Sequence, residues 1–142
     1  MESVPPDRYV LRDAKRIALE SLTHEFLFHP FKTYLTSKMR IEESLLLCDL
    51  EGARRRVREA VLLSRSESEE RRDEICGETD GEVIWITRGL SLSECVDTLL
   101  HEAMHDSVFV VRETRSGKRK NLPCDVEHEI IYSVLGPPYE EE

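Results

Sequence analysis

The chain has 142 residues and a formal net charge of −9, and 35% of its residues are charged. A chain of this length can bury one sizeable core, and it contains no apolar run long enough to cross a bilayer. Its first residues lack the basic and apolar regions of a secretory signal, which predicts an intracellular protein, cytoplasmic or alternatively nuclear. The cysteines are scattered without a C-x-x-C pair, so we expect free thiols at Cys48, Cys76, Cys95 and Cys124.

The charge is unevenly distributed along the chain. Residues 71–142 hold twice as many acidic as basic side chains, whereas residues 1–70 are nearly balanced. This acidity argues against general affinity for phosphates, so nucleic acid is an unlikely partner, and no membrane contact is expected. Two local basic segments stand out, Arg54–Arg58 and Arg115–Lys120. We interpret the first as a solvated helix face rather than a phosphate site.

Helical periodicity dominates residues 1–73. Apolar residues recur at helical spacing from about residue 8 to 29, which predicts one amphipathic helix. Residues 31–40 are expected to form a loop or a short helix. The apolar run Leu45–Cys48 fits either a strand or the start of a helix, and a further helix is predicted over about residues 52–64.

The first predicted helix contains two histidines with a glutamate after the first. They stand in His24-Glu25-Phe26-Leu27-Phe28-His29, just before Pro30, which disfavours continuation of the helix. The second histidine is at position i+5, too far round a helix to share a metal ion with the first. We therefore interpret both histidines as structural.

The period changes after residue 73. A segment rich in β-branched and aromatic residues at 82–87 follows an Asp-Gly turn signal, which predicts a β-hairpin over residues 74–87. Ser91 and Glu94 then form a capping box, so a helix should begin there and carry its apolar face through Ala103. The remaining predicted segments are a helix end or short strand at 108–111, a basic loop at 115–121 and a helix at 125–135.

These elements predict an α+β fold that is mainly helical, with a small β-hairpin or sheet packed on the helix that begins near Ser91. We expect a single domain over residues 1–142. It divides into a helical N-terminal part (1–73), a core (74–135) and an acidic tail (136–142).

The metal-binding prediction rests on the stretch His101-Glu102-Ala103-Met104-His105, an H-E-x-x-H motif. On a helix, side chains four residues apart lie on one face, so His101 and His105 can reach the same ion. Glu102 is one position round the helix and can address a water at the ion instead of the ion itself. The motif therefore predicts a catalytic zinc site.

A catalytic zinc site usually has three protein ligands, and the last predicted helix offers Glu127, His128 and Glu129. By helical geometry Glu127 falls near the centre of the apolar face, His128 toward its edge, and Glu129 away from it. A buried carboxylate is costly unless it is paired or bound to metal. Glu127 is therefore the preferred third ligand, with His128 and Glu129 as alternatives.

The motif on a helix after a strand, followed by a glutamate on the next helix, resembles the gluzincin branch of the zincin metallopeptidases. Residues 74–135 are similar in plan to minimal gluzincins and to ImmA/IrrE-type peptidases, which implies a zincin-like core and an intracellular peptidase. In zincins the substrate lies along an edge strand, and the resemblance assigns that role to Val83–Thr87. SprT-like peptidases use a third histidine, which keeps His128 as an alternative ligand.

The favoured function is a zinc-dependent metalloendopeptidase acting on a protein or peptide substrate. Glu102 would serve as general base toward a zinc-activated water, and Tyr132, Tyr139 or His128 are candidate donors to the oxyanion. One alternative is a non-catalytic or single-target zinc-binding regulatory or interaction protein. Another is a SprT-like, nucleic-acid-linked peptidase. The oligomeric state stays open.

Overall fold

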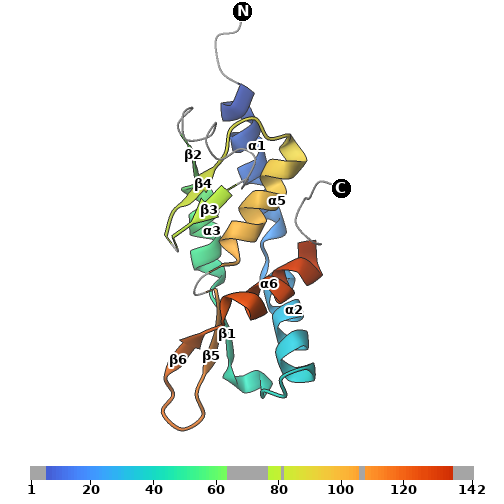
Figure 1. Cartoon of the computed structure of the whole chain (residues 1–142), viewed down its shortest axis with the longest axis vertical. Helices are drawn as coiled ribbons and strands as arrows, with labels where there is room; N and C mark the ends of the chain where they lie inside the picture. Colours follow the sequence, from blue (N-terminus) through green and yellow to red (C-terminus); the bar gives the residue numbers. More distant parts are fainter. Residues whose placement is uncertain (1–5, 64–76, 81, 106–107, 136–142) are drawn as a thin grey trace, which may run out of the picture.

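Helices form most of the chain, and two small sheets accompany them, so the α+β, mainly helical fold class is confirmed. The computed structural model describes residues 6–63, 77–80, 82–105 and 108–135. The helices are α1 (Pro6–Ser21), α2 (His24–Ser37), α3 (Leu50–Arg58), α5 (Leu92–Ala103) and α6 (Cys124–Leu135), with a 3-10 turn η1 (Glu43–Leu45) (Figure 1). The strands are β1 (Leu46–Cys48), β2 (Val61–Leu62), β3 (Gly77–Thr79), β4 (Ile84–Ile86), β5 (Phe109–Arg112) and β6 (Arg119–Asn121).

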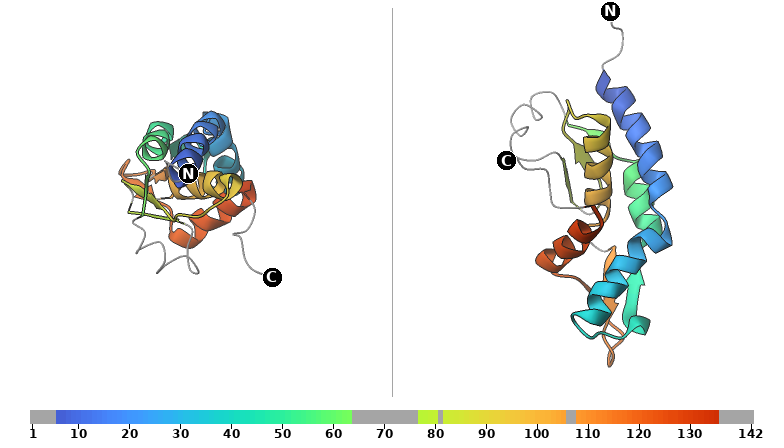
Figure 2. Two further views of the ribbon diagram at one scale, coloured as in Figure 1. Left: turned by 90° about the horizontal axis from the view of Figure 1, so that it is seen from above. Right: turned by 90° about the vertical axis from the view of Figure 1, so that its right-hand side faces the viewer.

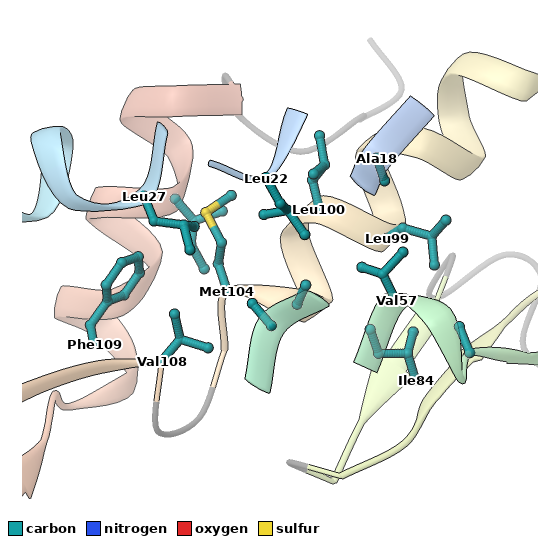
Figure 3. Packing of buried hydrophobic residues seen from close by; sticks show 14 of the residues in the cluster. Ala18, Leu22, Leu27, Val57, Ile84, Leu99, Leu100, Met104, Val108 and Phe109 are labelled. Atoms are coloured by element: carbon teal, nitrogen blue, oxygen red, sulfur yellow. The ribbon is translucent and has the colours of Figure 1, made fainter. Parts of the chain in front are cut away.

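The core lies between helices from the two halves of the sequence. Helices α1 and α5 run side by side along the upper part of the molecule, and α3 lies next to α1 and contacts both helices (Figures 1 and 2). Leu99 and Leu100 of α5 pack with Leu22 and with Val57 of α3, and all four are buried (Figure 3). The N-terminal part therefore completes the core on which the motif helix rests.

The structure corrects the predicted first helix. The chain breaks after Ser21, and Thr23 begins a second helix by accepting a hydrogen bond from Phe26 N at 3.1 Å. Helix α2 then continues through Pro30 to Ser37, where the end of the helix and then a loop or a short helix were expected. The gain from burying Phe31 and other apolar residues of α2 outweighs the hydrogen bond that the proline removes.

The predicted hairpin is confirmed as the antiparallel pair β3–β4, but the sheet has a third strand. Residues Val61 and Leu62, expected to be helical, form β2 and pair in parallel with Trp85 and Ile86 of β4. Strand β4 is therefore central, so the expectation that Val83–Thr87 is the edge strand is wrong. The periodicity of α3 could not show this, because a two-residue strand leaves no repeat to detect.

Strand β3 is the outermost strand of this sheet among the described residues, and it packs closely on the motif helix. A side chain at Gly77 would place its Cβ 2.6 Å from the Thr98 side chain and 3.0 Å from the carbonyl oxygen of Trp85. Glycine at this position is thus what allows β3 to approach α5.

The second sheet, in the order β1-β5-β6, lies at the other end of the molecule (Figure 1). Residues Phe109–Arg112 form a strand, one of the two expected alternatives. The expectation of a loop through residue 121 is wrong for Arg119–Asn121, which pair antiparallel with β5. The pairing depends on the partner strand, because these three exposed polar residues carry no strand signal of their own.

The described cysteines are free thiols, as expected: Cys48, Cys95 and Cys124. Burial raises the pKa of Cys48 to about 12 and that of Cys95 to about 11, so both stay protonated at neutral pH. Cys76, the acidic tail at 136–142 and Tyr139 lie outside the described residues.

Candidate metal centre

The motif lies at the end of α5, and its second histidine lies beyond the helix. The capping box is present as predicted: Ser91 Oγ accepts from Glu94 N at 3.2 Å, and Glu94 Oε1 accepts from Ser91 N at 2.9 Å. His101 is in the last turn, Met104 is the C-cap, and His105 follows it. The expectation that the whole motif is helical is therefore correct only as far as Ala103.

The two histidines still face one another. Their Nε2 atoms are 3.1 Å apart. Two imidazole nitrogens bound to one tetrahedral zinc at about 2.05 Å would be roughly 3.3 Å apart. The separation in the structure therefore fits a shared ion with little movement of either ring.

Helix α6 brings a third imidazole to this pair, because α6 packs against α5 at the end that carries the motif (Figure 1). The His128 ring centroid is 4.5 Å from that of His105 and 5.4 Å from that of His101. One nitrogen from each histidine lies within 4.8 Å of the others, and these three residues could hold a metal ion. His128 was one of the two alternatives to Glu127.

The electrostatics keep His101 and His128 neutral, which is the form that binds metals. Burial, followed by the neighbouring His105 and His128, lowers the pKa of His101 to about 4. Burial and the neighbouring His105 lower the pKa of His128, and the carboxylate of Glu127 opposes this only in part.

Glu127 is buried, as its place on the apolar face predicted, with 3% of its surface exposed. Its Oε1 lies 2.8 Å from Nδ1 of His105, and it does not belong to the three-histidine group. In the neutral ring this hydrogen bond favours the tautomer with the proton on Nδ1 and the lone pair on Nε2, the atom that faces His101. Here the carboxylate holds the ring of a candidate ligand in place.

The other candidates on α6 occupy different positions. Glu129 is exposed and outside the group, as the helical pattern predicted. Tyr132 stacks on His128, with ring centroids 5.4 Å apart and 15° between the planes, and lies 5.9 Å from His101. Sequence reasoning missed Cys124, whose Sγ is 3.6 Å from Nδ1 of His128. The i, i+4 spacing of these two residues was the available signal.

A pocket of about 400 Å³ opens beside His105 and His128. Glu102 lines it together with His105, Glu127 and His128, so the motif glutamate reaches the same space as the candidate ligands. Strand β3 also lines the pocket, with Gly77, Glu78 and Thr79. The site therefore combines imidazole nitrogens, a carboxylate and room for another molecule.

No helix in the described part of the chain is both long and apolar enough to span a membrane. The chain matched no protein-family model, no curated protein and no solved structure in the three comparisons made with known proteins.

Proposed function

We propose that this protein is a zinc-dependent endopeptidase whose metal is held by His101, His105 and His128. The observation that carries the proposal is that three half-buried imidazoles lie together, each with a nitrogen within 4.8 Å of the others, and that Glu127 is hydrogen-bonded to one of them. Three nitrogen ligands suit zinc, and they leave a fourth position for water or substrate. The three-histidine set replaces the ligand set with Glu127 that was preferred from sequence.

A zinc ion held there would supply a Lewis acid that acidifies water and polarises a carbonyl. Glu102 takes the proton of the attacking water and passes it to the leaving amine. Glu127 holds the ring of His105 in one tautomer, and a peptide entering the pocket lies against β3. Of the two candidate tyrosines, Tyr132 lies within the described residues, and we propose it as the hydrogen-bond donor to the oxyanion.

The test is a metal and activity measurement on the purified protein. We expect about one zinc per chain, a thermal shift on chelation, and chelator-sensitive cleavage of a mixed peptide library. Glu102→Gln should keep the zinc and lose the cleavage. Wild-type protein without zinc would overturn the site, and full cleavage by Glu102→Gln would overturn the mechanism.

Zinc binding without cleavage of any peptide would favour the alternative of a single-target or non-catalytic zinc-binding regulator. If the enzyme recognises its protein substrate through contacts outside the pocket, short peptides lack those contacts and are not cleaved. Cleavage should then reappear only with an intact partner protein, and Glu102→Gln would separate that case from simple binding.

A nucleic-acid-linked peptidase is the second candidate, and the β5–β6 hairpin favours it. In that hairpin Arg112 stands directly opposite Arg119, an arrangement of like charges that costs stability. Arg115 and Lys118 are exposed in the connecting turn. None of these four side chains forms an ion pair within the described ranges. Several positive charges of the hairpin could therefore bind the same anion.

The measurement for this candidate is binding to duplex DNA and to single-stranded RNA at two salt concentrations. Binding that weakens steeply with salt, and that is lost in the double variant Arg112→Ser and Arg119→Ser, would support it. Weak binding that is insensitive to salt would contradict it and agree with the acidity of the whole chain.

A further inference from the structure

We infer that Arg56 is a positioning residue for the candidate metal centre, holding the backbone of His105 where helix α5 no longer does. The inference rests on the proposed metal site. It gives a role at that site to the N-terminal part of the chain, for which the sequence suggested none.

The need for such a residue follows from where α5 ends. The helix stops at Ala103, and the amide of His105 donates to the carbonyl oxygen of Glu102 at 3.3 Å, three residues back instead of four. This longer bond closes a tight final turn, which fixes the chain less firmly than α-helical pairing does. A ligand beyond the end of its helix requires support from another element.

Arg56 provides that support from α3. Its side chain is buried, with 2% of the residue exposed. Nη1 donates to the carbonyl oxygen of His105 at 2.6 Å and lies 3.4 Å from that of Ala103. The guanidinium is always charged, and a cation is favoured at the C-terminal end of a helix. Arg56 thus holds the backbone of His105, while Glu127 holds its ring.

This placement corrects the interpretation of the arginine cluster as a solvated face. Arg55 and Arg58 are exposed, as expected, but Arg54 is half-buried and Arg56 is buried. An arginine is rarely buried unless its charge is hydrogen-bonded. Carbonyl groups at the end of α5 accept hydrogen bonds from Nη1 of Arg56.

Arg54 is a matched control on the same helix. Its Nη1 donates to the carbonyl oxygens of Leu19 at 2.6 Å and Leu22 at 3.0 Å, at the end of α1. The contact has the same chemistry as that of Arg56, but it supports a helix end that carries no candidate ligand. Loss of either arginine should destabilise the fold, and loss of Arg56 alone should change zinc binding.

The experiment compares Arg56→Met, Arg56→Lys and Arg54→Met in the full chain. Two readouts are taken: thermal unfolding of the zinc-free protein, and zinc affinity by competition with a chromophoric chelator. We expect both methionine variants to unfold at lower temperature than wild type. Arg56→Met should bind zinc at least about tenfold more weakly, which is the usual cost of losing a residue that hydrogen-bonds to a metal ligand. Arg56→Lys should recover part of that affinity, because it keeps the charge.

Equal zinc affinity in wild type, Arg54→Met and Arg56→Met would overturn the inference and leave the metal site intact. If Arg56→Met does not fold, Arg56→Lys decides, since affinity equal to wild type in that variant would also overturn it. Wild-type protein that binds no zinc would overturn the proposed metal site, and the inference with it. These failures are distinguishable because the first requires zinc binding by wild type.

Discussion

Two stretches of this chain begin with His-Glu and end with histidine, and only one of them forms a candidate site. In α2, His24 and His29 are exposed, and the His24 ring stacks on Phe28 with centroids 5.0 Å apart. At the end of α5, by contrast, His101 and His105 are half-buried with Nε2 atoms 3.1 Å apart. One residue of extra spacing separates the two patterns.

The difference shows that the spacing alone does not make the site. The α5 stretch meets a third imidazole from α6, a buried carboxylate and an arginine from α3. Among the described residues, the group that could hold a metal involves none of the α2 histidines. The comparison predicts that equivalent substitutions in the two stretches have very different effects.

The largest contrast is expected between Glu102→Gln and Glu25→Gln. If Glu102 is the general base, its loss should slow peptide cleavage about 10²- to 10⁴-fold and leave the zinc bound. Because Glu25 is exposed on another helix, Glu25→Gln should change neither the cleavage rate nor the zinc content. Rates of cleavage and zinc content of both variants check this, and an equal loss of activity in the two would break the comparison.

The next contrast is in metal binding. His105→Ala removes a candidate ligand, so zinc affinity should fall by more than the roughly 100-fold that loss of an outer partner can cost. His29→Ala should bind zinc like wild type, because His29 is exposed on another helix. Chelator competition measures both affinities. Unchanged affinity in His105→Ala would place the metal elsewhere.

A smaller effect distinguishes the two neighbours on α6. We expect His128→Ala to weaken zinc binding more than Glu127→Gln, whose cost should be about 10- to 100-fold because Glu127 only orients His105. The reverse order would restore Glu127 as the third ligand, as preferred from the sequence. Zinc titrations of the two variants, with circular dichroism to confirm folding, decide between them.

The smallest effect is expected at His24. Removing its ring in His24→Ala loses the stack on Phe28, and the exposed position should limit the cost to about 0.5 kcal/mol of unfolding free energy. Chemical denaturation provides the measurement, and zinc affinity should not change. A large loss of stability would mean that the α2 stretch has a structural role beyond this contact.

Local signals were sufficient for several features of the site. Ser91 and Glu94 predicted the start of α5, because a capping box is made by residues three positions apart. Helical periodicity predicted that Glu127 is buried and Glu129 exposed. It could not tell whether the buried carboxylate meets a metal or an imidazole, since that depends on how α6 packs against α5.

Features that involve two distant segments were the ones that the sequence left open or predicted wrongly. Strand β2 pairs with β4 across more than twenty residues, and Arg56 reaches the backbone of His105 from α3. Neither contact produces a repeating pattern in the sequence, because each involves only one or two residues and a partner far along the chain.

The sequence by itself determined the motif, the cap of its helix, the apolar faces and the α+β class, since each is a property of neighbouring residues. Only the tertiary structure decided that His128 joins His101 and His105, that Glu127 faces His105, and that α5 ends before the second histidine. The physical reason is that a site is defined by distances between side chains on different elements. Those distances follow from the packing of helices α3, α5 and α6.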